Sequence, residues 1–217
     1  MDRVQIVAYL PENYADFIHL FRHGWWENLS RAMILGITSH KFLALVAFTS
    51  IFLTPWNPWN IISVPTLAIL GRIAGIYWCY FKYEKLHLAT DLKDPELKFY
   101  TQSPNVLLMA KLTDTQQVIG FISYIEMDEE TVKMRRLNVH PDFRGLKLGW
   151  KLVVELMAKA KNNGYTKMYV NTSSPNIAAQ KLYVKMGFQP LDRILCFENT
   201  LVDLCTGLFD VAYIKQL

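Results

Sequence analysis

The stretch LNVHPDFRGLKLGWKL, residues 137–152, gives the strongest local signal of architecture in this chain. It reads as the end of a strand, a turn at Pro141, and a loop with Gly145 and Gly149 that runs into a helical pattern. A glycine-bearing loop at a helix N-terminus can present backbone N–H groups to a phosphate. Many phosphate loops of this shape have a further glycine where this chain has Lys147. Any residue supplies an amide there if its φ stays negative. The stretch therefore predicts an anion-binding loop, with an ordinary turn before a helix as the alternative.

The pattern on both sides of this loop predicts one α/β domain. Strand and helix patterns alternate here in the order strand, loop, helix, strand, helix, which is typical of crossover connections. The helix after the loop has apolar residues at a spacing of three and four. The expected strands cover residues 4–10, 105–112, 117–127, 132–139, 167–172, 191–197 and 208–214. The expected helices cover residues 12–23, 94–102, 149–162 and 175–186.

Composition indicates that part of this chain lies in lipid. Of its 217 residues, 52% are hydrophobic and only 19% are charged, whereas soluble domains are about 25% charged. The net charge of +4 does not imply nucleic-acid binding, but it suits an anionic membrane face or an anionic cofactor. The three cysteines form no CxxC motif or Cys/His cluster. We therefore expect neither a disulfide framework nor a metal site.

The apolar excess is concentrated in an insertion at residues 31–82. Two runs, residues 32–53 and 61–81, are each about as long as the roughly 20 residues that cross a bilayer. The linker between them, TPWNPWN, has two tryptophans that suit a membrane interface. Titratable residues interrupt both runs, namely His40, Lys41 and Arg72, and a charge in mid-bilayer is costly. We expect a two-helix membrane hairpin, with a re-entrant hairpin and a pair of buried soluble helices as alternatives.

Basic residues predict the orientation of this hairpin. They flank the outer ends of the two runs and are absent from the linker: Arg22, Arg31, Lys82 and Lys85. By the positive-inside rule both termini face the cytosol, and the domain outside the insertion lies there too.

A second stretch, NIAAQKLYVKMGF at residues 176–188, gives the loop a context. Together the two stretches resemble the GCN5-related N-acetyltransferase (GNAT) superfamily. The first is similar to its acetyl-CoA loop, Q/R-x-x-G-x-G/A, with Arg144 and Gly149 at the outer positions. The second is similar to N-x-x-A-x-x-L-Y-x-x-x-G-F, matching at Asn176, Ala179, Leu182, Tyr183, Gly187 and Phe188. The resemblance implies a single GNAT domain over residues 1–217, with a mixed, mostly antiparallel sheet of about seven strands flanked by helices.

The insertion narrows the resemblance to the camello-like N-acetyltransferases. In that family a membrane hairpin precedes a segment similar to TDL at residues 90–92. The family implies a membrane-bound enzyme of the endoplasmic reticulum. It would transfer acetyl directly from acetyl-CoA to a protein lysine, an N-terminal amine or a small amphipathic amine such as a cysteine S-conjugate. The rival hypothesis is a non-catalytic membrane scaffold with a GNAT fold that binds CoA or nothing.

The resemblance also implies roles for particular residues. The CoA pyrophosphate would meet the loop, at Arg144, Gly145, Leu146, Lys147, Leu148, Gly149 and Trp150. The backbone N–H groups of Leu137 and Val139 would polarise the thioester and hold the donor where their strand splays from the next. Asn176 would cap its helix and contact the pantetheine arm, and capping alone would also explain it. Tyr183 would protonate the leaving thiolate, with a half-buried packing role as the alternative.

The general base is not assigned by the sequence. Where several GNAT members place a glutamate on the strand before the loop, this chain has Lys133. Nearby acidic residues, Glu126 and residues 128–130, are typical of a solvated turn. His140 lies at the loop entry, and water is a further candidate. Arg135 and Arg136 either attract an acidic substrate or face solvent.

Overall fold

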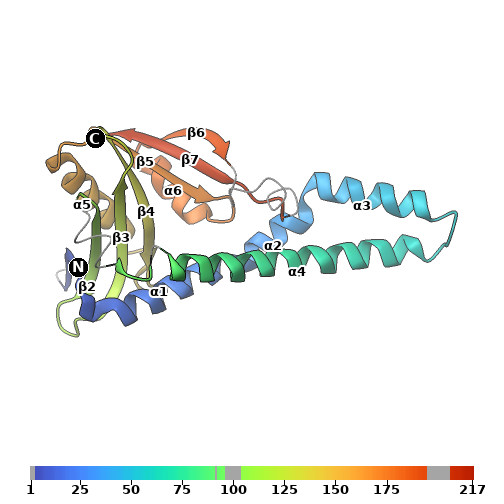
Figure 1. The fold of residues 1–217 in the computed structure, drawn as a ribbon, viewed down its shortest axis with the longest axis horizontal. Coiled ribbons are helices and arrows are strands. Elements are labelled where there is room, and N and C mark those ends of the chain that lie inside the picture. The colour runs from blue at the N-terminus through green and yellow to red at the C-terminus, as the bar shows by residue number, and fades with distance from the viewer. Residues whose placement is uncertain (1–2, 91, 96–103, 195–205) are drawn as a thin grey trace.

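The computed structural model of this chain describes residues 3–90, 92–95, 104–194 and 206–217. These residues form one seven-stranded sheet in the order β1-β2-β3-β4-β5-β7-β6, from which a long helical hairpin projects (Figure 1). The strands are β1 (Val4–Ala8), β2 (Val106–Leu112), β3 (Val118–Glu126), β4 (Thr131–Val139), β5 (Lys167–Ser173), β6 (Gln189–Ile194) and β7 (Asp210–Gln216). The pair β4–β5 is parallel and the other pairs are antiparallel. The expected GNAT architecture is thereby confirmed.

Two cores lie on opposite faces of the sheet. Successive side chains of a strand point to opposite faces, and β2 shows this division clearly. Its Leu107 and Met109 belong to the core with Phe17 of α1 (Tyr14–Glu27). Its Leu108 and Ala110 belong to the core shared with α5 (Leu148–Asn162) and α6 (Ile177–Lys185). The sheet is therefore covered on both faces, and a ligand can reach its middle only where two strands separate.

The strands β4 and β5 separate in this way. Their registered pairs run from Thr131–Lys167 to Met134–Val170, although β4 continues to Val139 and β5 to Ser173. Just past the last pair, β4 bulges against β3, and Arg136 has a φ of +62°. A bulge bends and twists its strand, so the bulge and the separation occur at the same point.

The projecting hairpin is built from α2 (Leu29–Thr38), α3 (His40–Leu53) and α4 (Asn60–Ala89). The run at residues 32–53 is not one straight helix, because the chain bends by 49° between the helix that ends at Thr38 and α3. By length and composition α4 can cross a membrane, and the bent pair adds a second such segment only if it is counted as one. Only 6% of the apolar window of α4 is buried, which does not fit the alternative of two buried soluble helices.

The base of the hairpin packs against the α/β domain through Arg72. The Arg72 Nε donates to the Gly36 carbonyl at 3.2 Å, and its guanidinium lies 4.5 Å from the centre of the Phe42 ring. A Cβ on Gly207, in the segment before β7, would lie 2.6 Å from Arg72 Nη2. The charge that interrupts the second apolar run is therefore turned toward protein at the base of the hairpin.

The expected elements agree with the observed ones within a few residues, apart from two places. The expected helix at residues 94–102 and the end of the expected strand at residues 191–197 lie largely outside the described residues. The chain after β6 returns to form β7 between β5 and β6, which the pattern of strands alone did not indicate.

Candidate active site

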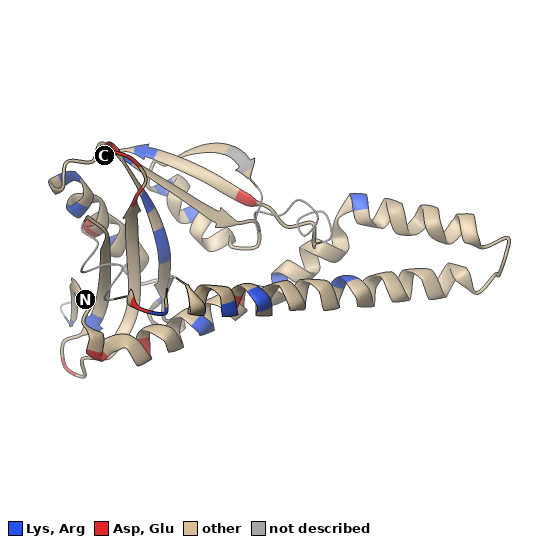
Figure 2. Cartoon of the chain, in the orientation of Figure 1, with Lys and Arg blue, Asp and Glu red and all other residues tan. Residues whose placement is uncertain are grey.

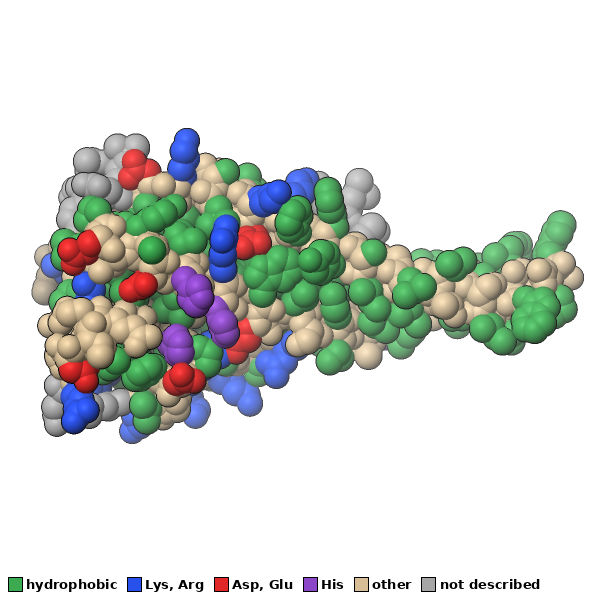
Figure 3. Space-filling model, turned by 90° about the horizontal axis from the view of Figure 1, so that it is seen from below, with side chains coloured by type: hydrophobic (Ala, Val, Ile, Leu, Met, Phe, Trp, Pro, Cys, Tyr) green, Lys and Arg blue, Asp and Glu red, His purple; other side chains and the backbone are tan. Residues whose placement is uncertain are grey.

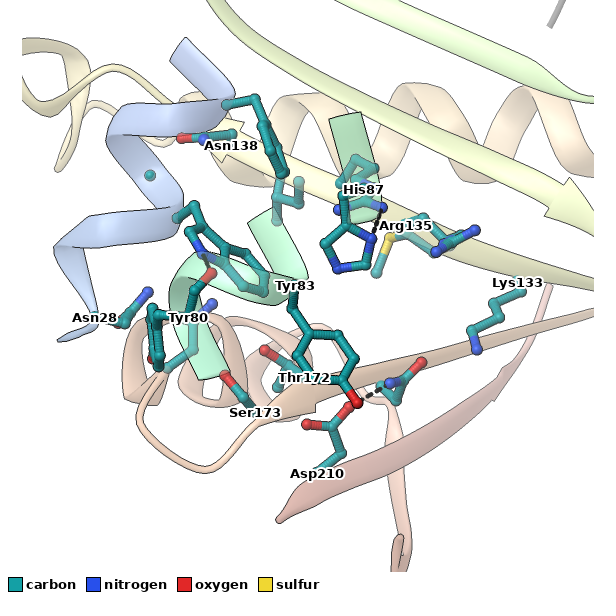
Figure 4. A pocket seen from close by; sticks show the side chains of 18 of the residues that line it. Asn28, Tyr80, Tyr83, His87, Lys133, Arg135, Asn138, Thr172, Ser173 and Asp210 are labelled. Carbon is teal, nitrogen blue, oxygen red and sulfur yellow. Dashed lines mark hydrogen bonds between the residues drawn. The ribbon is translucent and has the colours of Figure 1, made fainter. Parts of the chain in front are cut away.

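A cavity of about 390 Å³ lies where β4 and β5 separate. Its walls come from these two strands, α1, the C-terminal half of α4, the N-cap and last turn of α6, and the start of β7 (Figure 4). Of the residues expected to bind the acetyl donor, Leu137, Asn176 and Tyr183 line it. Val139 and the loop at residues 144–150 do not line it and lie further along the chain. The expected site thus has two parts, a cavity through the sheet and a loop beyond the end of β4.

The backbone of β4 points donors toward the gap. The N–H of His140 donates to the Ile119 carbonyl of β3 at 2.8 Å. Donors alternate between the two edges of a strand. The N–H groups of Leu137 and Val139 therefore point away from β3. They point toward the gap beside β5, beyond the last registered pair of β4 with β5. Two adjacent donors on one edge can hold a carbonyl oxygen or an amide of an extended ligand.

The loop after β4 leads directly into α5, and two of its residues have positive φ angles. Gly145 has a φ of +77° and Lys147 a φ of +58°. The condition of a negative φ at Lys147 is not met, because this residue adopts the left-handed conformation immediately before α5 begins at Leu148. A side chain in that region costs roughly 1–2 kcal/mol. The first N–H groups of α5 have no partners within the helix, as at any helix N-terminus, and the helix dipole makes them attractive to an anion.

Arg144 connects this loop to α1. Its guanidinium forms an ion pair with Glu27 in which Nη2 lies 2.7 Å from Oε2, and its Nε donates to the Val139 carbonyl at 2.9 Å. The hydrogen bond from Arg144 lowers the pKa of Glu27. The side chain thus fixes the direction in which the loop leaves β4.

Tyr183 and Asn176 enter the cavity from α6. The Asn176 Oδ1 accepts a hydrogen bond from the Ala179 N–H at 3.2 Å, which confirms the predicted cap. Tyr183 is 4% exposed, and its ring packs on Phe188 and Tyr213 at centroid distances of 5.7 and 5.8 Å. Burial raises the pKa of the Tyr183 hydroxyl, with a further contribution from Tyr213. The hydroxyl therefore stays protonated at neutral pH and is a hydrogen-bond and proton donor.

Cationic side chains line the side of the cavity that faces α1 and α4. They are Lys133, Arg135 and Arg136, and His87 of α4 lies beside them, as Figure 4 shows for Lys133, Arg135 and His87. The Arg136 Nη2 lies 3.1 Å from His87 Nδ1, and its guanidinium lies 5.2 Å from the centre of the Phe21 ring. Of the two alternatives for the arginine pair, plain exposure to solvent does not fit, because both residues are partly buried and border the cavity.

The acidic candidates near β4 lie away from this cavity. Glu130 Oε2 is bonded to Lys167 Nζ at 2.6 Å, and Asp128 accepts the backbone N–H of Glu130 in the β3–β4 turn. His140 has Nδ1 3.8 Å from Asp142 Oδ2, also outside the cavity.

One lining residue, Asp210, was missed by the sequence reasoning. It opens β7 and is 7% exposed. A lone aspartate within an expected strand gave no signal, because its position beside β5 depends on the sheet order.

The chain is similar in sequence to known N-acetyltransferases. The pattern of the "Acetyltransferase (GNAT) family" matches residues 70–188. "Probable N-acetyltransferase camello" of Xenopus tropicalis is 29% identical over 196 residues, 87% of each chain. Human "N-acetyltransferase 8B" is 24% identical over 166 residues, 74% of this chain and 69% of that one. "N-acetylaspartate synthetase" of Danio rerio is 30% identical over 103 residues, 47% of this chain and 36% of that one.

Solved structures share the fold. An acetyltransferase from Streptococcus agalactiae superposes with a TM-score of 0.58, at 16% identity, over 100% of both chains. A GNAT-family acetyltransferase from Staphylococcus aureus superposes with a TM-score of 0.56, at 17% identity, over 99% of both chains.

Proposed function

Because this chain belongs to the acetyltransferase (GNAT) family and is an acetyl-CoA-dependent N-acetyltransferase, we propose that it works at a membrane and acetylates an amine that also carries an acidic group. The observation that carries this proposal is the separation of β4 from β5 beside a cavity with three cationic side chains. The separation supplies room for the thioester, and the cations supply a counter-charge for the acceptor.

The donor side of the proposed site uses main chain and one tyrosine. The amides from Gly145 to Trp150 hold the two pyrophosphate charges at the start of α5, supported by its dipole. The N–H groups of Leu137 and Val139 face the gap and hold the thioester carbonyl and the adjacent arm, where negative charge develops. Tyr183 protonates the sulfur as it leaves, because its buried hydroxyl keeps its proton at neutral pH. Asn176 holds the N-terminus of α6, so that Tyr183 faces the same space.

The acceptor side lies toward α1 and α4. Side chains alternate along β4. Val132 and Met134 belong to the core shared with α5 and α6, so Lys133 and Arg135 point to the other face of the sheet, where the cavity lies. A carboxylate near the amine of the acceptor would meet these cations. The relative named N-acetylaspartate synthetase has an acidic amino acid in the name of its product, which supports this class of acceptor. Neighbouring cations also lower the pKa of a bound amine and so favour its neutral, nucleophilic form.

Membrane attachment is proposed through the hairpin. Residues 42–71 include no Lys, Arg, Asp or Glu, so the outer part of the hairpin is free of these residues in Figure 2. Figure 3 shows hydrophobic side chains along one side of it. Trp56 and Trp59 at the tip are 84% and 73% exposed, and Trp78 near the base is 64% exposed. From Trp59 to Trp78 a helix rises about 28 Å, close to the roughly 30 Å of hydrocarbon in a bilayer.

Aromatic residues at both ends of this length suit two membrane interfaces. We therefore keep two spans, over residues 32–53 and 61–81, with the α/β domain in the cytosol. Placement in the endoplasmic reticulum rests on the resemblance to the camello-like family alone.

Release of free thiol from acetyl-CoA by the detergent-solubilised full-length protein tests the proposed reaction. The acceptor panel contains acidic amino acids, S-substituted cysteines, a lysine peptide and a peptide with a free N-terminus. We expect the acidic small amines to give the highest kcat/KM. Binding of acetyl-CoA by calorimetry without thiol release for any amine would instead identify a scaffold.

A further inference from the structure

Asp210 is the only carboxylate among the described residues that line the cavity. It is 7% exposed, and a buried charged group is kept in place by pairing or hydrogen bonding. Figure 4 shows its side chain on the side of the cavity where Tyr83, His87 and Lys133 also lie. No part of the proposed donor site uses it.

The sheet holds this carboxylate in a defined place. Asp210 is registered opposite Ser173 of β5, and Asn171, two residues earlier on β5, is registered opposite Ala212. The side chains of Asn171 and Asp210 therefore lie on the same face, one diagonal step apart. The Asn171 Nδ2 donates to Asp210 Oδ2 at 2.5 Å. A carboxylate has about four lone-pair sites, and the bond from Asn171 occupies one of them and orients Asp210.

Asp210 and Tyr183 enter the cavity from opposite faces of the sheet. Val211 and Tyr213, the neighbours of Asp210 in alternation, belong to the core that contains Tyr183, α5 and α6. Because side chains alternate along β7, Asp210 faces the other side, toward α1 and α4. A thioester held in the gap between β4 and β5 would lie between the Tyr183 hydroxyl and the Asp210 carboxylate. An acid on one side and a base on the other is the arrangement that acyl transfer to an ammonium needs.

His87, the other titratable candidate for a base on this side, is engaged elsewhere. Its Nδ1 lies 3.1 Å from Arg136 Nη2. A guanidinium has no acceptor atom, so Arg136 donates and Nδ1 accepts. The ring also packs against Phe21 and Trp25 at centroid distances of 6.4 and 5.2 Å. These contacts hold the His87 ring beside Arg136.

We propose that Asp210 is the general base, binding the ammonium group of the acceptor and removing one of its protons. This inference rests on the proposed function and names the base that the sequence did not assign. The Asp210 carboxylate takes one proton from R–NH₃⁺ and becomes the neutral acid. The freed nitrogen lone pair forms the N–C bond as the C–S bond breaks. The sulfur takes the Tyr183 proton, and the second proton of the nitrogen replaces it on Tyr183. Asp210 returns its proton to solvent, so one proton leaves per turnover.

The Asp210→Asn variant tests this role. An asparagine Oδ1 can still accept the hydrogen bond from Asn171, so the contact between β5 and β7 is kept while proton acceptance is lost. We expect kcat/KM to fall by about 10²- to 10⁴-fold at pH 7, with acetyl-CoA affinity unchanged. We also expect the loss to shrink as the pH rises toward the pKa of the acceptor amine, since more of the acceptor then arrives neutral. The matched control is Asp114→Asn in the exposed β2–β3 turn, whose Oδ1 bonds the Thr115 N–H, and it should match the wild type.

Two results would overturn the assignment while the proposed function stands. They are a kcat/KM of Asp210→Asn within about threefold of wild type, or an equal loss at every pH. Should Asp210→Asn fail to bind acetyl-CoA, Asp210→Glu decides. Activity of Asp210→Glu above about a hundredth of wild type supports Asp210 as the base. If Asp210→Glu binds acetyl-CoA but has no activity, the assignment of Asp210 as the base is rejected. A wild-type protein that releases no thiol with any amine refutes the proposed function instead.

Discussion

At the scale of the single residue, Tyr183 carries the clearest chemical assignment. Its ring is held by Phe188 and Tyr213, and its hydroxyl borders the cavity. Tyr183→Phe keeps the ring contacts and removes the donated proton. We expect kcat to fall by about 10²-fold or more, with the dissociation constant of acetyl-CoA unchanged. Stopped-flow turnover and calorimetry measure the two quantities. Tyr14→Phe, which removes a hydroxyl bonded to the Leu92 carbonyl outside the cavity, is the control, and equal turnover in all three proteins contradicts the acid role.

The same hydroxyl predicts a pH dependence of stability. Its pKa is raised in the folded state by burial, above an unfolded value of about 10. At neutral pH this raised pKa does not make stability depend on pH, because the hydroxyl is protonated in both the folded and the unfolded state. Above pH 10 the unfolded state loses its proton first, so stability falls. The Tm of the wild type should decrease more steeply above pH 10 than that of Tyr183→Phe. Parallel decreases in the two proteins would show that other groups govern alkaline unfolding.

Substitutions of Lys147 distinguish the effect of its strained backbone on stability from the effect of its charge on acetyl-CoA binding. Glycine tolerates a φ of +58°, whereas alanine does not. We expect Lys147→Gly to raise the Tm by the equivalent of about 1 kcal/mol over Lys147→Ala. Both variants lose the ammonium group, so both should lose the same small part of the acetyl-CoA affinity, and Lys147→Glu should lose more. Scanning calorimetry and titration measure these effects. A Lys147→Glu protein with wild-type affinity would place the pyrophosphate elsewhere.

At the scale of the element, the close approach of α1 to β4 shapes the cavity. A Cβ on Gly24 would lie 2.0 Å from Asn138 Nδ2, which donates to the Leu20 carbonyl at 2.9 Å. Gly24→Ala should displace this bond and destabilise the fold by about 1–3 kcal/mol, measured by denaturant unfolding. Gly75→Ala in α4 is the control, because nothing lies within 4 Å of its Cβ position, and it should be neutral or stabilising. Equal effects of the two changes would contradict the close contact.

The sequence predicted the bounds of these elements better than it predicted which elements lie next to one another. Periodicity located the strands and helices because each has its own apolar pattern. The loop at residues 144–150 and the cap at Asn176 were found because their signals are local. The φ of Lys147 was missed because nothing local shows a lysine in a left-handed turn. Asp210 was missed because only the insertion of β7 between β5 and β6 brings it beside Asn171.

At the scale of the whole molecule, the apolar hairpin that we propose as the membrane anchor projects from the α/β domain that contains the cavity. The apolar residues of the hairpin lie on both sides of Arg72, while the cavity is lined by the C-terminal part of α4, from Tyr80 to His87. Composition predicted the apolar hairpin. The 49° bend between α2 and α3 was missed because neither Ser39 nor its two neighbours in the sequence are proline or glycine.

A cysteine at the tip tests the depth of insertion. Asn57→Cys, treated with a membrane-impermeant thiol reagent on sealed microsomes, should react only after the vesicles are opened, because two full spans place the tip on the far side. Asp114→Cys on the α/β domain is the control and should react in intact vesicles. Reaction of the tip cysteine in intact vesicles would indicate a hairpin that enters and leaves on one side.

The most direct measurement of the central claim is a single turnover with radiolabelled acetyl-CoA and a matched pair of acceptors. One is an α-amino acid with an acidic side chain, and the other has a carboxamide in place of the side-chain carboxylate. The predicted result is label on the amine nitrogen, with no label on the protein and transfer to the acidic acceptor at least about tenfold faster, as one lost charge-assisted contact implies. Label that remains on CoA, or that accumulates on the protein before reaching the amine, would contradict direct transfer in this cavity.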